Sequence, residues 1–146
     1  MDGDRLNRRL MALREFGGTP EGGTARLAYS DDDLAARAWL TERMEAAGLE
    51  VSVDLAGNLI GRRSGADPSL RSIVLGSHID SVPEGGNYDG QVGSVGALEV
   101  AATLADAGHT TRHPLEVAVW ANEEGGKTGS RALSGEVEPA ELEIRT

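Results

Sequence analysis

Residues 72–121 of the chain read SIVLGSHIDSVPEGGNYDGQVGSVGALEVAATLADAGHTTRHPLEVAVWA, and this stretch decides the fold. Residues 72–79 contain the apolar run Ile73–Leu75, which is short enough for a strand buried on both faces. Apolar residues then recur at helical spacing from Val95 to Ala105, and a second apolar run, residues 114–121, indicates another buried strand. The order strand, helix, strand predicts an α/β fold in which helices cover a sheet.

The sequence on the N-terminal side continues this alternation of helices and strands. Ser30 precedes three aspartates, and a capping serine followed by acids in the first turn is a strong start for a helix. Gly48 is a natural end for that helix. The other elements predicted here are a helix from residue 6 to about residue 17 and strands at 49–55 and 59–62.

The sequence after the second buried strand is less regular. Residues 122–130 are rich in glycine and are predicted to form a loop. The remainder is polar and charged, and Pro139 argues against one long helix there. The alternation of helices and strands is therefore expected to run from Leu49 to Ala121.

The composition excludes several classes of protein and site. The 24 acidic residues outnumber the 14 lysines and arginines and give a net charge of −10, which argues against nucleic acid and anionic membrane surfaces as partners. No cysteine is present, so disulfides and thiolate metal sites are excluded. No apolar run approaches the roughly 20 residues of a membrane span, and the N-terminus lacks an apolar signal core, which predicts a cytoplasmic protein.

Candidate metal ligands follow both buried strands, where α/β sheets bind their ligands. His78 and Asp80 follow the first strand, Glu123 and Glu124 follow the second, and Asp89 lies in the intervening loop. Two residues apart in extended chain, His78 and Asp80 face the same way, so one can bind a metal while the other receives the remaining imidazole N–H and fixes its tautomer. Taken singly, each also fits a hydrogen-bonded histidine, a turn aspartate or a solvated acid.

The adjacent glutamates permit a division of labour. One carboxylate can bind a cation while its neighbour stays free as a base that takes a proton from water and passes it to a leaving nitrogen. Residues 126–128 (GKT) also resemble the end of a phosphate-binding loop. However, Ala121 stands where that loop requires glycine, and two acids would face the phosphates, so nucleotide binding is disfavoured.

Taken together, these motifs resemble the M20-type metallohydrolases, and within them the N-carbamoyl-L-amino-acid hydrolase and allantoate amidohydrolase group. The resemblance spans nearly the whole chain. The motifs that carry it are GSHIDSVP (76–83), GNYDG (86–90), NEEG (122–125), AGNLIGRR (56–63) and GSRALSG (129–135).

The resemblance implies a role for each candidate residue. His78 would bind one metal, Asp89 would bridge two, and Glu124 would bind the second. Glu123 would be the general acid/base, and Asp80 would orient His78. The implied cofactors are two divalent ions, zinc or alternatively manganese, cobalt or nickel, and the implied reaction is hydrolysis of a linear C–N bond in a small carbamoyl or ureido compound.

The resemblance also implies the fold and its extent. It predicts a mixed sheet with helices on both faces, a zinc-peptidase-like catalytic domain, and one that is incomplete. Residues 1–146 would be the N-terminal part of that domain, without the dimerisation domain. Family members are much longer, and their further metal ligands and substrate-binding positions would lie beyond residue 146.

Two departures from the family pattern bear on activity. The segment from Gly125 to Thr128 looks shortened, and the remaining histidines, His109 and His113, are expected at the wrong end of the sheet. Each cation would then have two protein ligands, where a catalytic zinc has three plus water, so we expect a truncated chain without measurable hydrolysis. A complementary chain or homo-oligomer is a possible partner. The alternatives are an M20 aminopeptidase or deacylase and a non-catalytic remnant.

Overall fold

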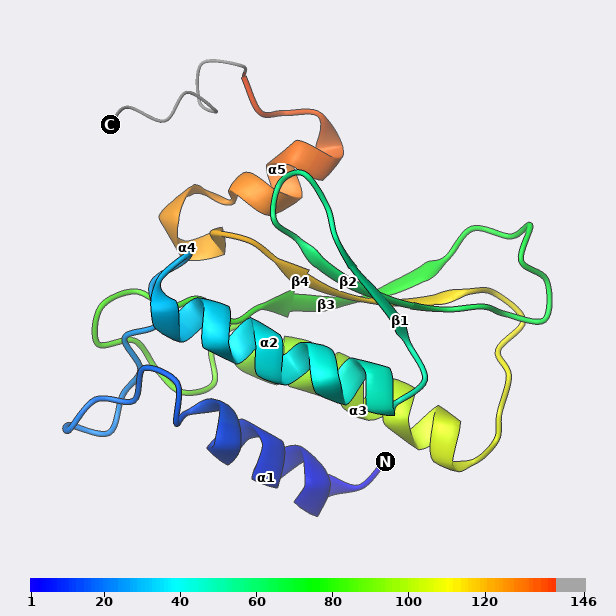
Figure 1. Cartoon of the computed structure of the whole chain (residues 1–146), viewed down its shortest axis with the longest axis horizontal. Coiled ribbons are helices and arrows are strands. Elements are labelled where there is room, and N and C mark those ends of the chain that lie inside the picture. The colour runs from blue at the N-terminus through cyan, green and yellow to red at the C-terminus, as the bar shows by residue number, and fades with distance from the viewer. Residues whose placement is uncertain (139–146) are drawn as a thin grey trace.

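The computed structural model describes residues 1–138, which form one four-stranded sheet with helices (Figure 1). The predicted strands are all present, each within a residue or two of its expected bounds. The helices are α1 (Gly3–Leu13), α2 (Asp31–Ala46), α3 (Gln91–Asp106), α4 (Glu123–Gly126) and α5 (Thr128–Ser134), and the strands are β1 (Glu50–Val53), β2 (Leu59–Arg63), β3 (Ile73–His78) and β4 (Leu115–Trp120).

The sheet is mixed, as predicted. Its strand order is β1-β2-β4-β3, with antiparallel pairing of β1 with β2 and of β2 with β4. The last pair, β3 and β4, is parallel and connected by α3, because a parallel pair needs a crossover. In its register His78 lies opposite Trp120, so both strands end at the same edge.

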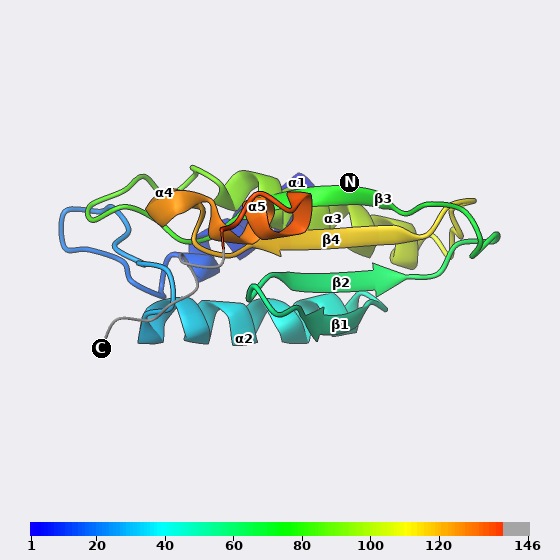
Figure 2. The ribbon, with the colours of Figure 1, turned by 90° about the horizontal axis from the view of Figure 1, so that it is seen from above.

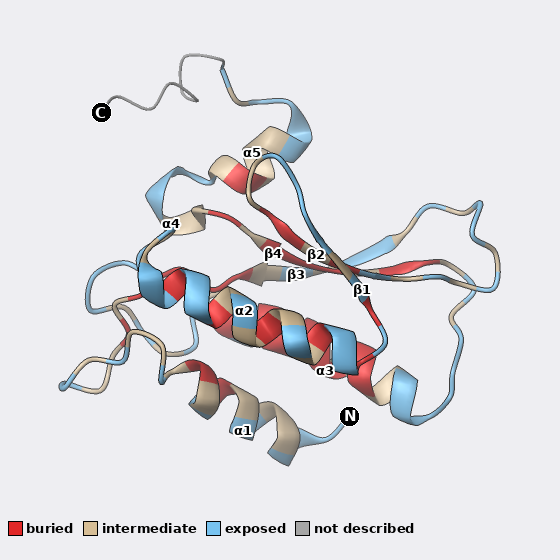
Figure 3. Ribbon diagram, in the orientation of Figure 1, coloured by how far each residue is buried: buried red, intermediate tan, exposed pale blue. Residues whose placement is uncertain are grey.

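Helices lie on both sides of the sheet, which confirms the predicted α/β architecture. Figures 1 and 2 show α2 and α3 beneath one face, α1 against α3, and the short α5 on the opposite side near the ends of β2 and β4. The buried core lies between the sheet and the long helices (Figure 3). The opposite face is more open, because Val74 of β3 remains 49% exposed. The prediction that this strand is buried on both faces is wrong, because β3 is an edge strand and its first two residues are exposed.

The long helices start where local sequence favours a start. The side chain of Ser30 accepts the backbone N–H of Asp33, so the predicted cap of α2 is confirmed. The next long helix, α3, begins at Gln91, earlier than its apolar repeat indicated, and directly after Gly90. That early start places Asp89 one residue before the helix N-cap.

The prediction of a loop at 122–130 is wrong, because α4 and α5 occupy most of it. Both helices are entered through left-handed residues, Asn122 with φ 52° and Lys127 with φ 57°. Helices this short are not stable from their own sequence, so contacts with the rest of the molecule must hold them. The first helix ends at Leu13, before the predicted Gly17, and Pro139 lies outside the described residues.

A buried ion cluster joins α1 to α3. The Glu99 side chain of α3 is fully buried, and Arg5 of α1 grips it with two hydrogen bonds of 2.8 and 2.9 Å. Arg9 donates a third bond of 2.9 Å, and Thr103 and the backbone N–H of Asp2 donate two more. Because such a carboxylate has all its acceptor positions filled, this cluster fastens α1 to the domain.

None of the helices within residues 1–138 is long and apolar enough to cross a membrane.

Candidate metal centre

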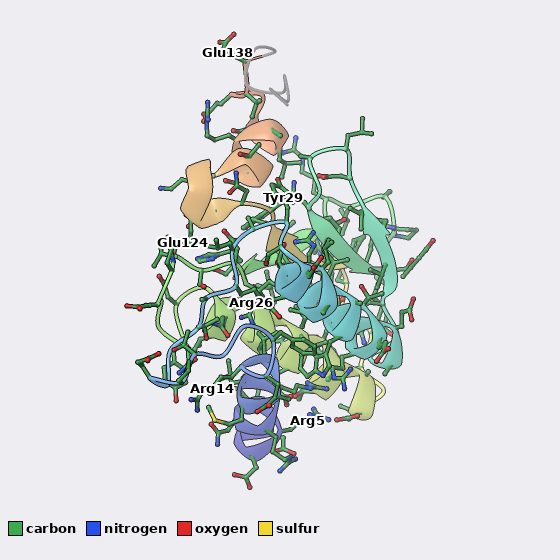
Figure 4. All side chains as sticks on the ribbon, turned by 60° about the vertical axis from the view of Figure 1, so that its left-hand side comes forward. Arg5, Arg14, Arg26, Tyr29, Glu124 and Glu138 are labelled. Carbon is green, nitrogen blue, oxygen red and sulfur yellow. The ribbon has the colours of Figure 1, made fainter. Side chains whose placement is uncertain are left out.

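The candidate site lies at the sheet edge where β3 and β4 end together. His78 is the last residue of β3, and Glu123 and Glu124 open α4, three and four residues after Trp120. Asp89 reaches the same edge from the N-terminal end of α3. Figure 4 labels Glu124 at this end of the sheet, at the start of α4.

Three of the predicted metal ligands meet at this edge. His78, Asp89 and Glu124 each offer a ligand atom, and these atoms lie within 4.8 Å of one another. His78 is buried, Glu124 is half-buried, and Asp89 is exposed, so the cluster opens toward solvent. Imidazole and carboxylate are the donors that zinc accepts when no thiolate is present. The donor set and its convergence therefore fit a divalent cation, while the individual roles stay predictions.

Backbone contacts fix the orientation and tautomer of the His78 ring. Its Nδ1 lies 3.0 Å from the backbone oxygen of Asp80. A carbonyl only accepts hydrogen bonds, so Nδ1 carries the hydrogen and the neutral ring presents the Nε2 lone pair. The Asp80 carboxylate stands farther away, with Oδ1 at 3.7 Å from Nδ1. The backbone of Asp80 thus holds the ring, and the role predicted for its carboxylate stays a prediction.

The Asp80 carboxylate instead joins the two strand ends. Its Oδ2 accepts the backbone N–H of Glu124 at 3.0 Å. This bond links the residue that follows β3 by two positions to the first turn of α4. It therefore helps to hold the glutamate pair beside His78.

Glu123 also approaches the histidine but from another direction. Its Oε2 lies 3.6 Å from His78 Nε2, and its side chain is 27% exposed. The exposed Lys127 ammonium lies 4.0 Å from Oε1 of the same carboxylate. Glu123 is thus close to the ring nitrogen that would face a metal, and it remains reachable from solvent.

Gly90 allows the loop to pass directly over the histidine. It has φ +65°, and a Cβ at this position would lie 2.4 Å from His78 Nε2 and Cε1. Any side chain here would therefore displace the ring. Ser94, one turn into α3, donates its hydroxyl to the His78 backbone oxygen at 2.9 Å and fixes the helix against the strand end.

The electrostatics of the cluster disfavour another negative charge. Burial raises the pKa of Glu124, and the neighbouring Asp89 carboxylate raises it further, while His78 acts in the opposite direction. The cause is that desolvation and like charges both disfavour the ionised acid. A bound cation would remove this penalty.

A cavity of about 250 Å³ adjoins the cluster. Asp80 and Glu124 supply its polar part, and apolar wall residues come from two segments that are far apart in sequence. The full lining is Leu27, Ala28, Asp80, Ser81, Val82, Pro83, Asn122, Glu124 and Gly125. The site therefore has space for a small molecule beside its carboxylates.

The other histidines do not contribute to the cluster, as predicted. His113 precedes β4, at the opposite end of that strand, and its Nδ1 lies 2.9 Å from the backbone oxygen of Arg71. His109 lies within the connection from α3 to β4, at the same end of the sheet.

One supporting residue had no signal in the sequence. Arg26 is fully buried and donates its Nε–H to the backbone oxygen of Ile79, the residue between His78 and Asp80. Its Nη1 binds the backbone oxygens of Leu13 and Phe16 (Figure 4). The arginine thus ties the segment after α1 to the strand end that carries the histidine, a link between residues about 53 positions apart.

Comparison with known proteins identifies the family. The family model for peptidase family M28 matches residues 58–146, more than half of the chain. The chain belongs to this family. Peptidase family M28 consists of metal-dependent hydrolases, which agrees with the gathered ligand set.

Individual relatives confirm the branch that the motifs indicated. The chain is 42% identical over 150 residues to the N-carbamoyl-L-amino acid amidohydrolase of Geobacillus stearothermophilus, covering 99% of this chain and 37% of that protein. It is 36% identical to the allantoate amidohydrolase of Escherichia coli K12, covering 89% and 33%. The ureidoglycolate hydrolase of Arabidopsis thaliana is also 36% identical, with 97% and 31% covered.

Solved structures give the same result. A hydantoinase/carbamoylase family amidase from Burkholderia ambifaria superposes with a TM-score of 0.93 at 43% identity, covering 97% of this chain and 36% of that one. A second amidase of that description, from Burkholderia vietnamiensis, gives 0.91 at 43% identity, covering 96% and 35%. The chain thus spans about a third of the length of the curated relatives and structures it matches.

Proposed function

We propose that this chain provides the metal-binding part of an amidohydrolase that cleaves linear C–N bonds in small carbamoyl or ureido compounds. The observation that carries the proposal is the convergence of His78, Asp89 and Glu124 within 4.8 Å. The names of the relatives supply the substrate class. On this proposal residues 1–146 correspond to the N-terminal part of a catalytic domain, and the remaining ligands come from a further segment or from a complementary chain.

The three ligands suit a pair of divalent cations. His78 would help to hold one ion, Glu124 would help to hold the second, and Asp89 would serve both. Zinc fits this donor set, with manganese, cobalt or nickel as substitutes. When bound, such ions acidify water and polarise a carbonyl oxygen, which lowers the barrier to amide hydrolysis.

Glu123 would move the proton in this reaction. Its carboxylate lies 3.6 Å from His78 Nε2 and is partly exposed, so it can reach a water molecule at the site without serving as a ligand. It would accept the proton from the attacking water and deliver it to the departing nitrogen, which leaves as the amine. Asp80 would hold both the His78 ring, through its backbone oxygen, and the Glu124 backbone, through its carboxylate.

Metal titration of the purified chain tests the ligand assignment. We expect the 146-residue protein to bind Zn²⁺ or Mn²⁺ in isothermal titration calorimetry, and we expect H78A to lose most of this affinity. His113→Ala is the matched control, because His113 lies at the other end of β4. Equal affinities for wild type and H78A would contradict the assignment.

Activity is tested best in a chimera that joins this chain to the remaining part of the Geobacillus stearothermophilus relative. We expect the metal-loaded chimera to hydrolyse N-carbamoyl-L-amino acids, and we expect E123Q to abolish turnover while retaining metal. The chain alone should show no measurable hydrolysis, because its described residues give each cation two ligands. Hydrolysis by the chain alone would contradict that expectation, and an inactive metal-loaded chimera would contradict the proposed reaction.

Peptide-bond hydrolysis is the second candidate, favoured by the description of the matching family as a peptidase family. The same chimera discriminates between the two, because dipeptides and N-acyl amino acids can be offered beside N-carbamoyl-L-amino acids and allantoate. Faster turnover of a dipeptide would favour this second function.

A further inference from the structure

Asn58 lies at the turn between β1 and β2, outside the ligand cluster, yet its side chain reaches the segment that carries the glutamates. The residue is fully buried. Its Oδ1 accepts the backbone N–H of Ala121 at 2.9 Å, and its Nδ2 donates to the backbone oxygen of Gly129 at 3.0 Å. We infer that Asn58 is a positioning residue that fixes Glu123 and Glu124 for metal binding, an inference that rests on the proposed function.

The two residues that Asn58 binds are the ends of one closed segment. The Gly129 N–H donates to the Ala121 backbone oxygen at 2.9 Å, and the Thr128 N–H donates to Asn122 at 3.3 Å. The Asn122 side chain closes the same ring of residues, because its Nδ2 donates to Thr128 Oγ1 at 2.9 Å. Glu123 and Glu124 lie within this segment, so its closure decides where the carboxylates stand.

The oxygen and both N–H groups of the Asn58 side-chain amide form hydrogen bonds. The Ala121 N–H is a donor, so the atom facing it must be the amide oxygen, and this fixes the orientation of the group. The nitrogen then divides its two hydrogens between Gly129 and Asp54 Oδ2, which lies 2.8 Å away. Aspartate would lose both donors, and alanine would lose every contact.

Gly129 interlocks with this amide. A Cβ on Gly129 would lie 2.0 Å from Asn58 Oδ1 and 2.5 Å from the Ala121 nitrogen. The position therefore requires glycine for the close approach. A substitution of Gly129 would disrupt the same junction, formed by the hydrogen bonds of Asn58 with Ala121 and Gly129.

Other hydrogen bonds also hold the turn, besides the one from the Asn58 amide to Asp54. The Asp54 carboxylate already accepts the backbone N–H groups of Ala56 and Asn58 at 2.9 Å each, and the Asp54 N–H binds the Asn58 backbone oxygen at 3.0 Å. The buried amide also acts on the segment that carries Glu124, whose carboxylate lies within 4.8 Å of the Asp89 carboxylate. Repulsion between these like charges favours separation of the two carboxylates. The hydrogen bonds from Asn58 to Ala121 and Gly129 oppose this separation.

Amide hydrogen exchange of the full chain without added metal tests the positioning directly. In N58A we expect the Glu124 and Gly129 amides to exchange about tenfold faster or more, while the Val117 and Val119 amides of β4 keep their wild-type rates. L59A is the matched control, because Leu59 is buried in the core beside Asn58 but has no side-chain amide that could form these hydrogen bonds. It should lower Tm and accelerate all four amides together.

Zinc titration then separates positioning from general stability. At a temperature where all variants are folded, we expect N58A to bind Zn²⁺ about tenfold more weakly than wild type, and L59A to match wild type. If N58A fails to fold, G129A opens the same junction with Asn58 intact and should give the same selective exchange. Equal acceleration of Glu124 and Val117, or equal zinc affinities of the Asn58 and Leu59 variants, would overturn the inference. Failure of wild type to bind zinc would reject the proposed function alone, because the exchange rates still decide the positioning.

Discussion

The protein contains two clusters of charged side chains that are built on opposite principles. Between α1 and α3, the buried Glu99 meets two arginines and two further hydrogen-bond donors, so its charge is matched within the fold. At the ends of β3 and β4, several carboxylates converge on one histidine. Within residues 1–138, the lysine that pairs with one of these carboxylates is the exposed Lys127, whose Nζ lies 4.0 Å from Glu123 Oε1.

The same residue type therefore responds in opposite ways. The hydrogen bonds from Arg5 lower the pKa of Glu99 to about 2, whereas burial and Asp89 raise the pKa of Glu124. A carboxylate that is matched by the protein serves the fold. A carboxylate that the protein places near other carboxylates needs a positive charge from outside. This difference distinguishes the Glu99 cluster, which stabilises the fold, from the proposed metal site.

The largest effect should follow removal of the charge from the matched cluster. E99Q leaves Arg9 without the Glu99 charge and leaves Arg5 with its exposed partner Asp106, and breaking a largely buried pair costs about 3 kcal/mol of the free energy of unfolding. Urea denaturation would measure this loss. Zinc affinity of the folded variant should stay at the wild-type value, and a fall in affinity would show that the two clusters are coupled.

Neutralising the open cluster should instead affect binding. In E124Q one ligand is lost, and we expect Zn²⁺ affinity to fall about 100-fold, equivalent to about 2.7 kcal/mol. Calorimetric titration would measure the change, with E45Q on the exposed side of α2 as the control. An unchanged affinity would remove Glu124 from the ligand set.

Acid should weaken the matched cluster next. A lowered pKa means that Glu99 stabilises the folded state above its unfolded value of 4.5, and this contribution is lost as pH falls from 4.5 toward about 2. About half of the loss should appear by pH 3, so the difference in unfolding free energy between wild type and E99Q should shrink over that range. A constant difference would contradict the assigned pKa direction.

The smallest effect concerns the open cluster without metal. A raised pKa means that ionised Glu124 disfavours the folded state above its normal pKa, and that this penalty disappears as pH falls. E124Q should therefore stabilise the chelator-treated protein at pH 7 by on the order of 0.5 kcal/mol, after allowance for solvent screening. Thermal unfolding at pH 7 and pH 4 measures the gain, which should vanish at the lower pH.

The sequence predicted the sheet and the residues that gather at its end because both depend on local pattern. The run Ile73–Leu75 and the segment 114–121 identified the paired strands, and polar residues at their ends identified His78 and Glu124. Side chains that directly follow neighbouring parallel strands lie close together in space, because such strands end at a common edge of the sheet.

The residues that support the site could not be predicted in the same way. Asn58 contacts Ala121, 63 positions away, and Arg26 contacts Ile79 across 53. Glu99 lies in an apolar helix and gives no sign that its partner is Arg5, 94 positions earlier. Likewise α4 was predicted as a loop, because its four residues form a helix only through contacts outside their own sequence.

The position of β4 between β2 and β3 has a consequence for folding. These two strands precede β4 in the chain but do not pair with each other, so until residues 115–120 leave the ribosome the sheet is two unconnected parts. Their arrival joins both parts at once, and long-range pairing of this kind is slow. Glu123 and Glu124 emerge directly afterwards, so closure of the sheet and delivery of the glutamates to His78 become one coupled step.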